Sequence, residues 1–179
     1  MSRYLRAGAA GATYFFTAAL QDRSARWLVD HVAVLRACVA RTKALHPFEI
    51  DAMVVLPEHV HALWTLPAED ADFSLRWRLI KRDFTRHLMQ HGLLDTAARS
   101  SRRPGERNVW QRRFWEHQIR DERDFGRHAD YIHYNPVKHG YAATAAAWPH
   151  SSFHAFVAKG AYPANWAAAD ADTQAREWS

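Results

Sequence analysis

The sequence has few cysteines and no long apolar run, and these absences exclude several classes of protein. Its 179 residues include a single cysteine, Cys38, which excludes a disulfide framework and any zinc site of clustered cysteines. No stretch approaches the roughly eighteen uninterrupted apolar residues of a membrane-spanning helix, so no membrane partner is expected. Hydrophobic residues make up 48% and aromatic residues 13%, enough to bury a core, so extensive disorder is excluded as well.

Lysine is also scarce, and arginine carries most of the positive charge. Four of the 24 basic residues are lysine, and the formal net charge is +5 with neutral histidine. Positions 76–127 hold 14 basic residues (13 arginines and Lys81) against 7 acidic ones, which leaves the rest of the chain net negative. Guanidinium groups bind phosphates and guanine edges in a bidentate way, so this segment suits a nucleic-acid surface. A solvated helix face is the alternative.

The first twenty residues resemble a signal peptide only superficially. Arg3 and Arg6 precede a small and apolar run, but that run contains the β-prone sequence YFFT and is followed by QDR rather than a small-residue cleavage site. We therefore expect a first strand, no targeting signal and a cytoplasmic protein.

The expected order of elements is β-α-β-β-α-β followed by a further helix. Apolar residues at helical spacing predict the helices, and aromatic or alternating runs predict the strands. This order is typical of an α+β, ferredoxin-like fold, an antiparallel sheet with helices on one face. The expected strands are 11–20, 48–56, 59–66 and 109–119, and the expected helices are about 24–45, 72–90 and 121–135.

One domain is expected over residues 1–166. Inside it, positions 92–108 are polar and contain Pro104-Gly105, which predicts a flexible basic loop. Short elements, including one at 151–158, follow Gly140. The alanine- and aspartate-rich residues 167–179 are expected to form a loosely packed tail.

The sequence His59-Val60-His61 is the first candidate site. Residues i and i+2 of a strand share a face, so both imidazoles project together, while Val60, Ala62 and Trp64 pack under the helices on the other face. Two neutral imidazoles can bind a divalent cation and need a third ligand to complete the site. In a chain with 12 histidines this pattern is weak evidence by itself.

The second candidate site lies at the end of the last helix, in the sequence DYIHYNP. Tyr131 and Asn135 are four residues apart and share a helix face, which we expect to turn away from the apolar stripe of Phe125 and Ile132. A phenol followed by a carboxamide can supply a nucleophile and an oxygen ligand. Alternatively, Tyr131 is an ordinary surface aromatic and Asn135 ends the helix before Pro136.

Four segments, in order, resemble the REP-associated tyrosine transposases, relatives of the single-tyrosine HUH transposases of bacterial insertion sequences. They are LPEHVHALWTLP, DFSLRWRLIKRDFTRHL, GERNVWQRRFWEHQIRDERDF and DYIHYNPVKHG, and the similarity runs from about Thr13 to Trp166. The resemblance implies a metal-dependent nuclease and strand transferase. Its substrate would be single-stranded DNA with hairpins from repetitive extragenic palindromes, and it would act as a monomer or homodimer.

The resemblance also implies roles for individual residues. The two HUH histidines, which bind Mg²⁺ or Mn²⁺ in the family, correspond to His59 and His61. The catalytic tyrosine corresponds to Tyr131, which we prefer to the nearby Tyr134. Attack by Tyr131 would leave a 5′-phosphotyrosine and a free 3′-OH, and the reverse attack would rejoin the strands.

The resemblance leaves several candidates for the third metal ligand. Insertion-sequence relatives have a glutamine four residues after the tyrosine, and the matching residue here is Asn135. Because asparagine is shorter and Pro136 follows it, Glu58, His128, His133 and water are alternatives.

The basic segment is expected to bind the DNA, and Trp110, Phe114 and Trp115 could stack on unpaired bases, although core packing suits two of the three equally well. A hairpin-binding protein that does not cut, and a metal-dependent hydrolase that uses water instead of tyrosine, are the competing functions. The candidate DNA-binding residues are Arg76, Arg78, Lys81, Arg82, Arg86, Arg112, Arg113 and Lys138.

Overall fold

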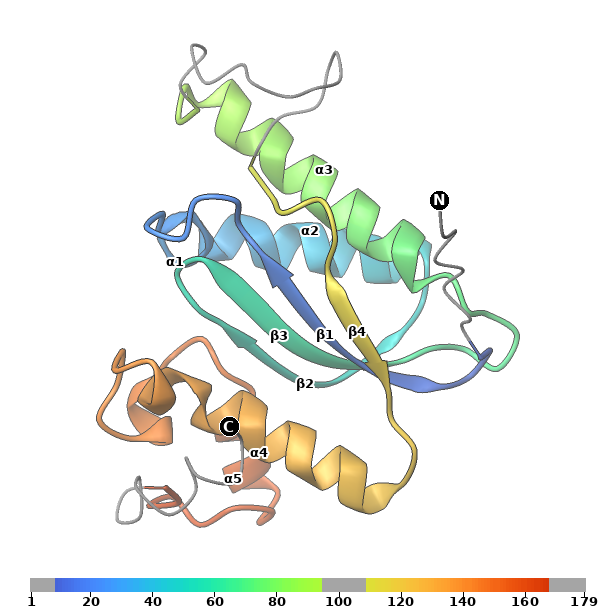
Figure 1. Ribbon diagram of the computed structural model, residues 1–179, viewed down its shortest axis with the longest axis vertical. Coiled ribbons are helices and arrows are strands. Elements are labelled where there is room, and N and C mark those ends of the chain that lie inside the picture. Colours follow the sequence, from blue (N-terminus) through green and yellow to red (C-terminus); the bar gives the residue numbers. More distant parts are fainter. Residues whose placement is uncertain (1–8, 95–108, 168–179) are drawn as a thin grey trace, which may run out of the picture.

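The computed structural model describes residues 9–94 and 109–167, and it arranges them around a four-stranded antiparallel sheet of order β2-β3-β1-β4 (Figure 1). Most of the predicted basic loop and the predicted tail lie outside these residues. Within them, no helix combines the length and the apolar character needed to cross a membrane. The strands are β1 (Thr13–Ala19), β2 (Glu49–Val55), β3 (His59–Thr65) and β4 (Trp115–Gln118), and the helices are α1 (Trp27–Asp30), α2 (Val32–Leu45), α3 (Phe73–Gln90), α4 (Glu122–Lys138), the 3₁₀ helix η1 (Ala145–Ala147) and α5 (Phe153–Ala158).

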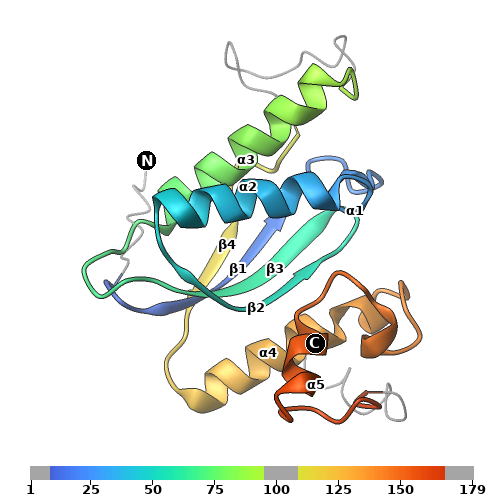
Figure 2. The same cartoon turned by 180° about the vertical axis from the view of Figure 1, so that it is seen from behind.

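Helices α2 and α3 cover one face of the sheet, which confirms the predicted ferredoxin-like arrangement (Figure 2). The alternate residues of β1 and β3 that point to this face form the larger core. Its centre is aromatic: the rings of Trp64 and Trp77 stack 4.4 Å apart, and Phe16 packs against both. Val60, Ala62 and Trp64 therefore lie under the helices as the alternation predicts.

Helix α4 packs on the opposite face of the sheet, below it in Figure 1. Ala129 and Ile132 of α4 contact a smaller apolar cluster that includes Val54 and Leu63. The histidine face of β3 is therefore bounded by α4, and the site lies between the sheet and this helix.

Three predicted boundaries are wrong. The helix expected at 24–45 is divided into α1 and α2 at His31, and the fourth strand is only the four residues of β4. The last helix continues through Pro136 to Lys138. Because Pro136 lies in the last turn, its missing N–H costs one intrahelical bond and does not stop the helix.

Gly140 then reverses the chain at the end of α4. It has a φ of +70°, which favours glycine. Its N–H donates to the carbonyl of Val137 at 3.0 Å, and the N–H of Tyr141 donates to the carbonyl of Pro136 at 2.8 Å, a Schellman motif. The turn returns Tyr141 to the sheet, where its hydroxyl donates to Glu58.

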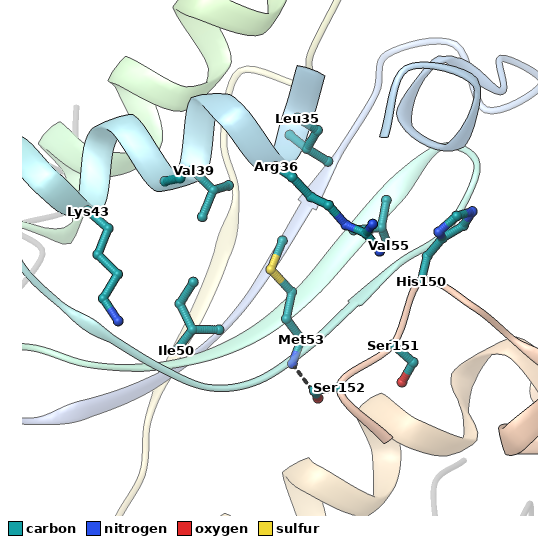
Figure 3. Close-up of a pocket in the computed structure, with 11 residues that line it drawn as sticks. Leu35, Arg36, Val39, Lys43, Ile50, Met53, Val55, His150, Ser151 and Ser152 are labelled. Atoms are coloured by element: carbon teal, nitrogen blue, oxygen red, sulfur yellow. Dashed lines mark hydrogen bonds between the residues drawn. The ribbon is translucent and has the colours of Figure 1, made fainter. Parts of the chain in front are cut away.

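The segment after η1 covers the free edge of β2. The indole N–H of Trp148 donates to the carbonyl of Val55 at 2.9 Å. The N–H of Met53 donates to the hydroxyl of Ser152 (Figure 3), and the N–H of Ser152 donates to the carbonyl of Met53. A cavity of ≈ 390 Å³ lies between this segment, β2 and α2, and none of the predicted catalytic or metal-binding residues lines it.

His133 supplies a test of how tightly this segment holds α4. Its imidazole is buried against Phe156 and bonds the Ser152 hydroxyl at 2.8 Å, and burial lowers its pKa from 6.5 to about 4. The folded state therefore favours the neutral ring of His133. The stabilisation from this buried neutral ring is fully present above pH 6.5 and is lost as the pH falls towards 4. Between pH 7.5 and 5 we expect the wild type to lose about 2 kcal/mol more unfolding free energy than His133→Gln, measured by urea denaturation. An equal loss in both proteins would contradict this.

Candidate active site

His59 and His61 lie side by side on β3, with their ring centroids 4.7 Å apart. Both are almost fully buried. The Nδ1 of His59 donates to the Glu58 carboxylate at 2.9 Å, because a carboxylate can only accept. The Nε2 of His59 therefore keeps its lone pair. A carboxylate behind an imidazole is the usual arrangement of a metal-binding histidine.

The second histidine has a similar support. The Nδ1 of His61 bonds the hydroxyl of Thr17 at 2.8 Å, across the β1–β3 pair. Its Nε2 is buried and has no hydrogen-bond partner among the residues the structure describes. A buried nitrogen without a partner is costly, so this atom fits a metal ligand.

The electrostatics keep both imidazoles neutral. Burial lowers the pKa of His59, partly offset by Glu58, and burial together with His59 lowers the pKa of His61 well below its usual value. Burial alone would raise the pKa of Glu58, but its contacts with His59 and Tyr141 outweigh this and lower it. Neutral imidazoles beside a carboxylate are the protonation states that a divalent cation requires.

Tyr131 reaches this pair from α4. Its ring centroid lies 5.1 Å from that of His61, and the two rings meet edge to face. Phe15 of β1 supports both rings, at 5.9 Å from Tyr131 and 5.5 Å from His61. The Nζ of Lys138 lies 5.1 Å above the Tyr131 ring, so a cation is already beside the phenol.

Asn135 lies one turn after Tyr131 and is fully buried, at 0% exposure. Neither its amide oxygen nor its amide nitrogen has a hydrogen-bond partner in the described part of the chain. The expectation that Tyr131 and Asn135 turn away from the apolar stripe of α4 is therefore wrong, because Tyr131 packs against the same apolar cluster and Asn135 is enclosed. A buried amide without a partner fits an oxygen ligand that a cation would satisfy.

The alternative third ligands are engaged elsewhere. Glu58 holds His59 through one oxygen and Tyr141 through the other. His128 donates from Nδ1 to the carbonyl of Asp124, and His133 bonds Ser152 on the far side of α4. Each of these side chains therefore supports another residue.

Comparison with known proteins shows the family of this chain. No family model matches the chain. A REP-associated tyrosine transposase of Escherichia coli (strain K12) is 45% identical over 177 residues, which cover 99% of this chain and 98% of that protein. The chain belongs to the REP-associated tyrosine transposases. A solved structure of a REP-associated tyrosine transposase bound to a REP hairpin is 46% identical, with a TM-score of 0.80 over 93% of this chain and 92% of that one.

The basic residues of this family member occupy three places. Arg78, Arg82 and Arg86 are exposed at intervals of four residues along α3, and Arg82 pairs with Asp83 at 2.8 Å. Arg112 and Arg113 are exposed just before β4, and Lys138 is exposed beside Tyr131. The Nζ of Lys81 donates to the carbonyl of Gln111 at 3.2 Å and so joins α3 to the β4 segment.

Arg76 differs from the other candidate arginines. Its side chain is 1% exposed, and its guanidinium donates to the carbonyls of His46, Pro47 and Asp72 and to the carboxylate of Asp70. These bonds tie the loop before β2 to the start of α3, which leaves Arg76 no surface for DNA. We therefore leave it out of the DNA-binding set.

The aromatic residues near β4 also differ in how deeply they are buried. Trp110 is in the core, and Phe114 is half-buried against Phe16 and Trp77. Trp115 is the exposed ring of the three.

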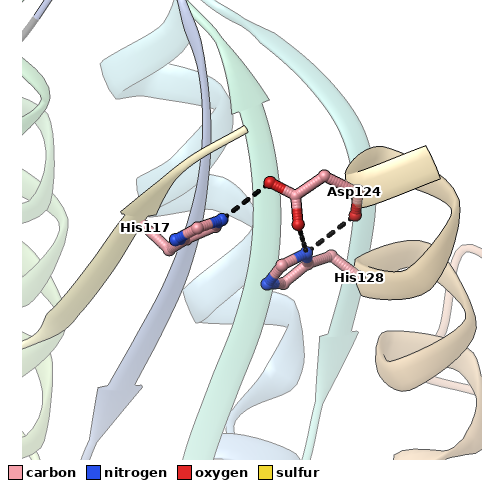
Figure 4. Close-up of side chains that lie close together, drawn as sticks. All are labelled: His117, Asp124 and His128. Carbon is pink, nitrogen blue, oxygen red and sulfur yellow. Dashed lines mark hydrogen bonds and ion pairs between the residues drawn. The ribbon is translucent and has the colours of Figure 1, made fainter. Parts of the chain in front are cut away.

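Sequence reasoning missed a cluster around Asp124, which joins α4 to β4 (Figure 4). Its buried carboxylate accepts from His117 at 2.8 Å, from the backbone and side chain of Arg120, and from Arg127 at 3.3 Å. Burial alone would raise the pKa of Asp124, but these donors hold it well below its usual value. His117, Asp124 and His128 have the spacing of a metal site, yet the two arginines already offset the carboxylate charge. Asp124 and His128 are four residues apart, one turn of the predicted helix, and this spacing could have indicated that the two side chains lie together.

We expect Asp124→Asn to loosen the attachment of α4 to the sheet. The amide has one oxygen in place of two and carries no charge, so it cannot replace the bonds to His117, Arg120 and Arg127 together. Because the arginines are partly exposed, we expect a loss of about 2 kcal/mol in unfolding free energy, measured by urea denaturation. The matched variant Asp121→Asn keeps a helix-capping side chain and should cost less than half as much. Equal costs would show that Asp124 acts only at the helix start.

Proposed function

We propose that this chain cleaves and rejoins single-stranded DNA beside palindromic hairpins, using Tyr131 as the nucleophile and a divalent cation as the cofactor. The observation that carries the proposal is the 5.1 Å separation between the rings of Tyr131 and His61, across the gap between α4 and the sheet. The hairpin bound to the 46%-identical solved transposase supports the same class of substrate.

His59 and His61 would hold the cation, Mg²⁺ or Mn²⁺, through their Nε2 atoms, with Asn135 Oδ1 as the third ligand. Glu58 and Thr17 orient the imidazoles through the opposite ring nitrogens. When bound, such a cation neutralises charge on the non-bridging phosphate oxygens during attack.

The tyrosine performs the covalent step. Its phenolic oxygen forms a bond to phosphorus as its proton leaves to solvent, the bond from phosphorus to the 3′ oxygen breaks, and that oxygen takes up a proton. The products are a 5′-phosphotyrosine on Tyr131 and a free 3′-OH. Lys138, whose Nζ lies over the Tyr131 ring, places a positive charge where the negatively charged phosphate would enter. Attack by a 3′-OH on the same phosphorus reverses the step and joins the strands.

The placement of the basic residues implies a path for the DNA. The arginines of α3 lie on the opposite face of the sheet from α4, and the segment before β4, with Arg112 and Arg113, runs between them (Figure 1). If the duplex stem binds to the arginines of α3, its single-stranded flank can extend along the β4 edge of the sheet to Tyr131.

Covalent capture of DNA tests the proposal. The protein is incubated with the REP hairpin of the solved relative, extended by single-stranded flanks, and is then boiled in SDS and run on a gel. We expect a shifted band with Mn²⁺ or Mg²⁺ and none with EDTA. DNA binding without a covalent band in either metal would favour a non-cleaving binding protein.

A further inference from the structure

A cavity of ≈ 240 Å³ lies beside Tyr131, where β1, β4 and α4 meet. Phe15, Thr17, Trp115, His128 and Tyr131 line it, so four of its five walls are flat rings. Neither His59 nor His61 lines the cavity, which therefore extends from Tyr131 towards β4. It is adjacent to the proposed metal ligands and separate from them.

Trp115 forms the outer wall, and 55% of its surface is exposed. Its ring meets Phe15 edge to face at 5.6 Å and lies parallel to His117 at 6.0 Å. An indole that is half exposed at the mouth of a cavity offers a flat apolar face to a ligand. Exposed aromatic rings on a basic surface are typical platforms for unpaired bases, and Arg112 and Arg113 lie just before this ring.

His128 gives the cavity a polar group of known direction. Its Nδ1 bonds the backbone carbonyl of Asp124 at 2.8 Å, and a carbonyl only accepts, so Nδ1 carries the hydrogen. The other ring nitrogen, Nε2, points away from Asp124 (Figure 4). In the neutral ring it is an acceptor, which suits an exocyclic amino group of adenine, cytosine or guanine; thymine has no amino group and could offer only its ring N3–H.

We propose, on the basis of the proposed function, that this cavity holds the unpaired base of the nucleotide next to the phosphate that Tyr131 attacks. Trp115 stacks on the base, and His128 accepts a hydrogen bond from its amino group. Because Tyr131 forms a wall of both the cavity and the metal site, the base in the cavity fixes which phosphate lies beside the phenol. The cavity therefore sets the point of cleavage.

Base fluorescence tests the cavity without any chemistry. Tyr131→Phe protein is titrated, in EDTA, with the flanked REP hairpin of the solved relative, in which 2-aminopurine replaces one flank base at a time. We expect strong quenching at a single position. Adding Trp115→Ala should remove that quenching and weaken binding about tenfold, whereas Trp115→Phe should retain most of both. His128→Leu should remove the preference for amino-bearing bases at that position.

The outcomes separate the two proposals. Failure of the Tyr131→Phe protein to bind the hairpin would contradict the proposed function and this inference together. Tight binding with the same quenching in Trp115→Ala would overturn the cavity assignment and leave the proposed function standing. Leu45→Ala, which removes another exposed apolar side chain, from α2, should change neither measurement.

Discussion

Replacing Tyr131 by phenylalanine is expected to abolish covalent capture of DNA. The substitution removes one oxygen, and the remaining ring keeps its packing on Phe15 and His61. Because that oxygen is the proposed nucleophile, the rate of adduct formation should fall at least about thousandfold, while the affinity for hairpin DNA stays within about twofold. Adduct formation is followed on denaturing gels, and affinity is followed by mobility shift.

Tyr134→Phe is the matched control. Tyr134 lies three residues later on the same helix and is 4% exposed, whereas Tyr131 is partly exposed. We expect this variant to form the adduct at close to the wild-type rate. An adduct that survives in Tyr131→Phe and disappears in Tyr134→Phe would exchange the two roles. Metal-dependent cleavage without an adduct in both variants would favour a hydrolase that uses water.

The histidine face of β3 was predictable because it depends on local periodicity. Alternation along a strand places His59 and His61 on one face and Val60 and Ala62 on the other, whatever packs around them. The hydrophobic side faces α2 and α3 as expected. The support of the imidazoles by Glu58 and Thr17 was not predicted, since the Thr17 bond depends on the pairing of β1 with β3.

The environment of α4 was less predictable, because it depends on contacts between distant segments. The helix packs on the sheet with Ala129 and Ile132, but the chain after Gly140 returns and encloses another side of it. That segment has no clear periodicity, so the burial of Asn135 could not be derived from it. Arg76 illustrates the same limit, since its carbonyl partners His46 and Pro47 lie about thirty residues earlier.

Removing an imidazole from the pair should have the second large effect. His61→Ala deletes the buried Nε2, which has no partner within residues 9–94 and 109–167, and we expect the rate of adduct formation in Mn²⁺ to fall at least about a hundredfold. Calorimetric titration should show weaker Mn²⁺ binding. DNA affinity in EDTA shows whether the variant is folded and should be retained. His154→Ala, which removes an exposed histidine from α5, is the control and should behave like the wild type. Full activity in His61→Ala would exclude this pair as the metal site.

Asn135 extends this argument to stability. The buried Asn135 amide, which has no partner among the described residues, destabilises the metal-free protein. Asn135→Leu, with a side chain of similar length, should therefore raise the unfolding free energy by about 1 kcal/mol or more. The same variant should show a smaller increase in melting temperature on addition of Mn²⁺ and slower adduct formation than the wild type. A gain in metal-free stability together with a loss of metal response is expected only if the amide is kept for a ligand. If the variant were less stable and responded normally to Mn²⁺, Asn135 would be a packing residue and the third position would belong to water.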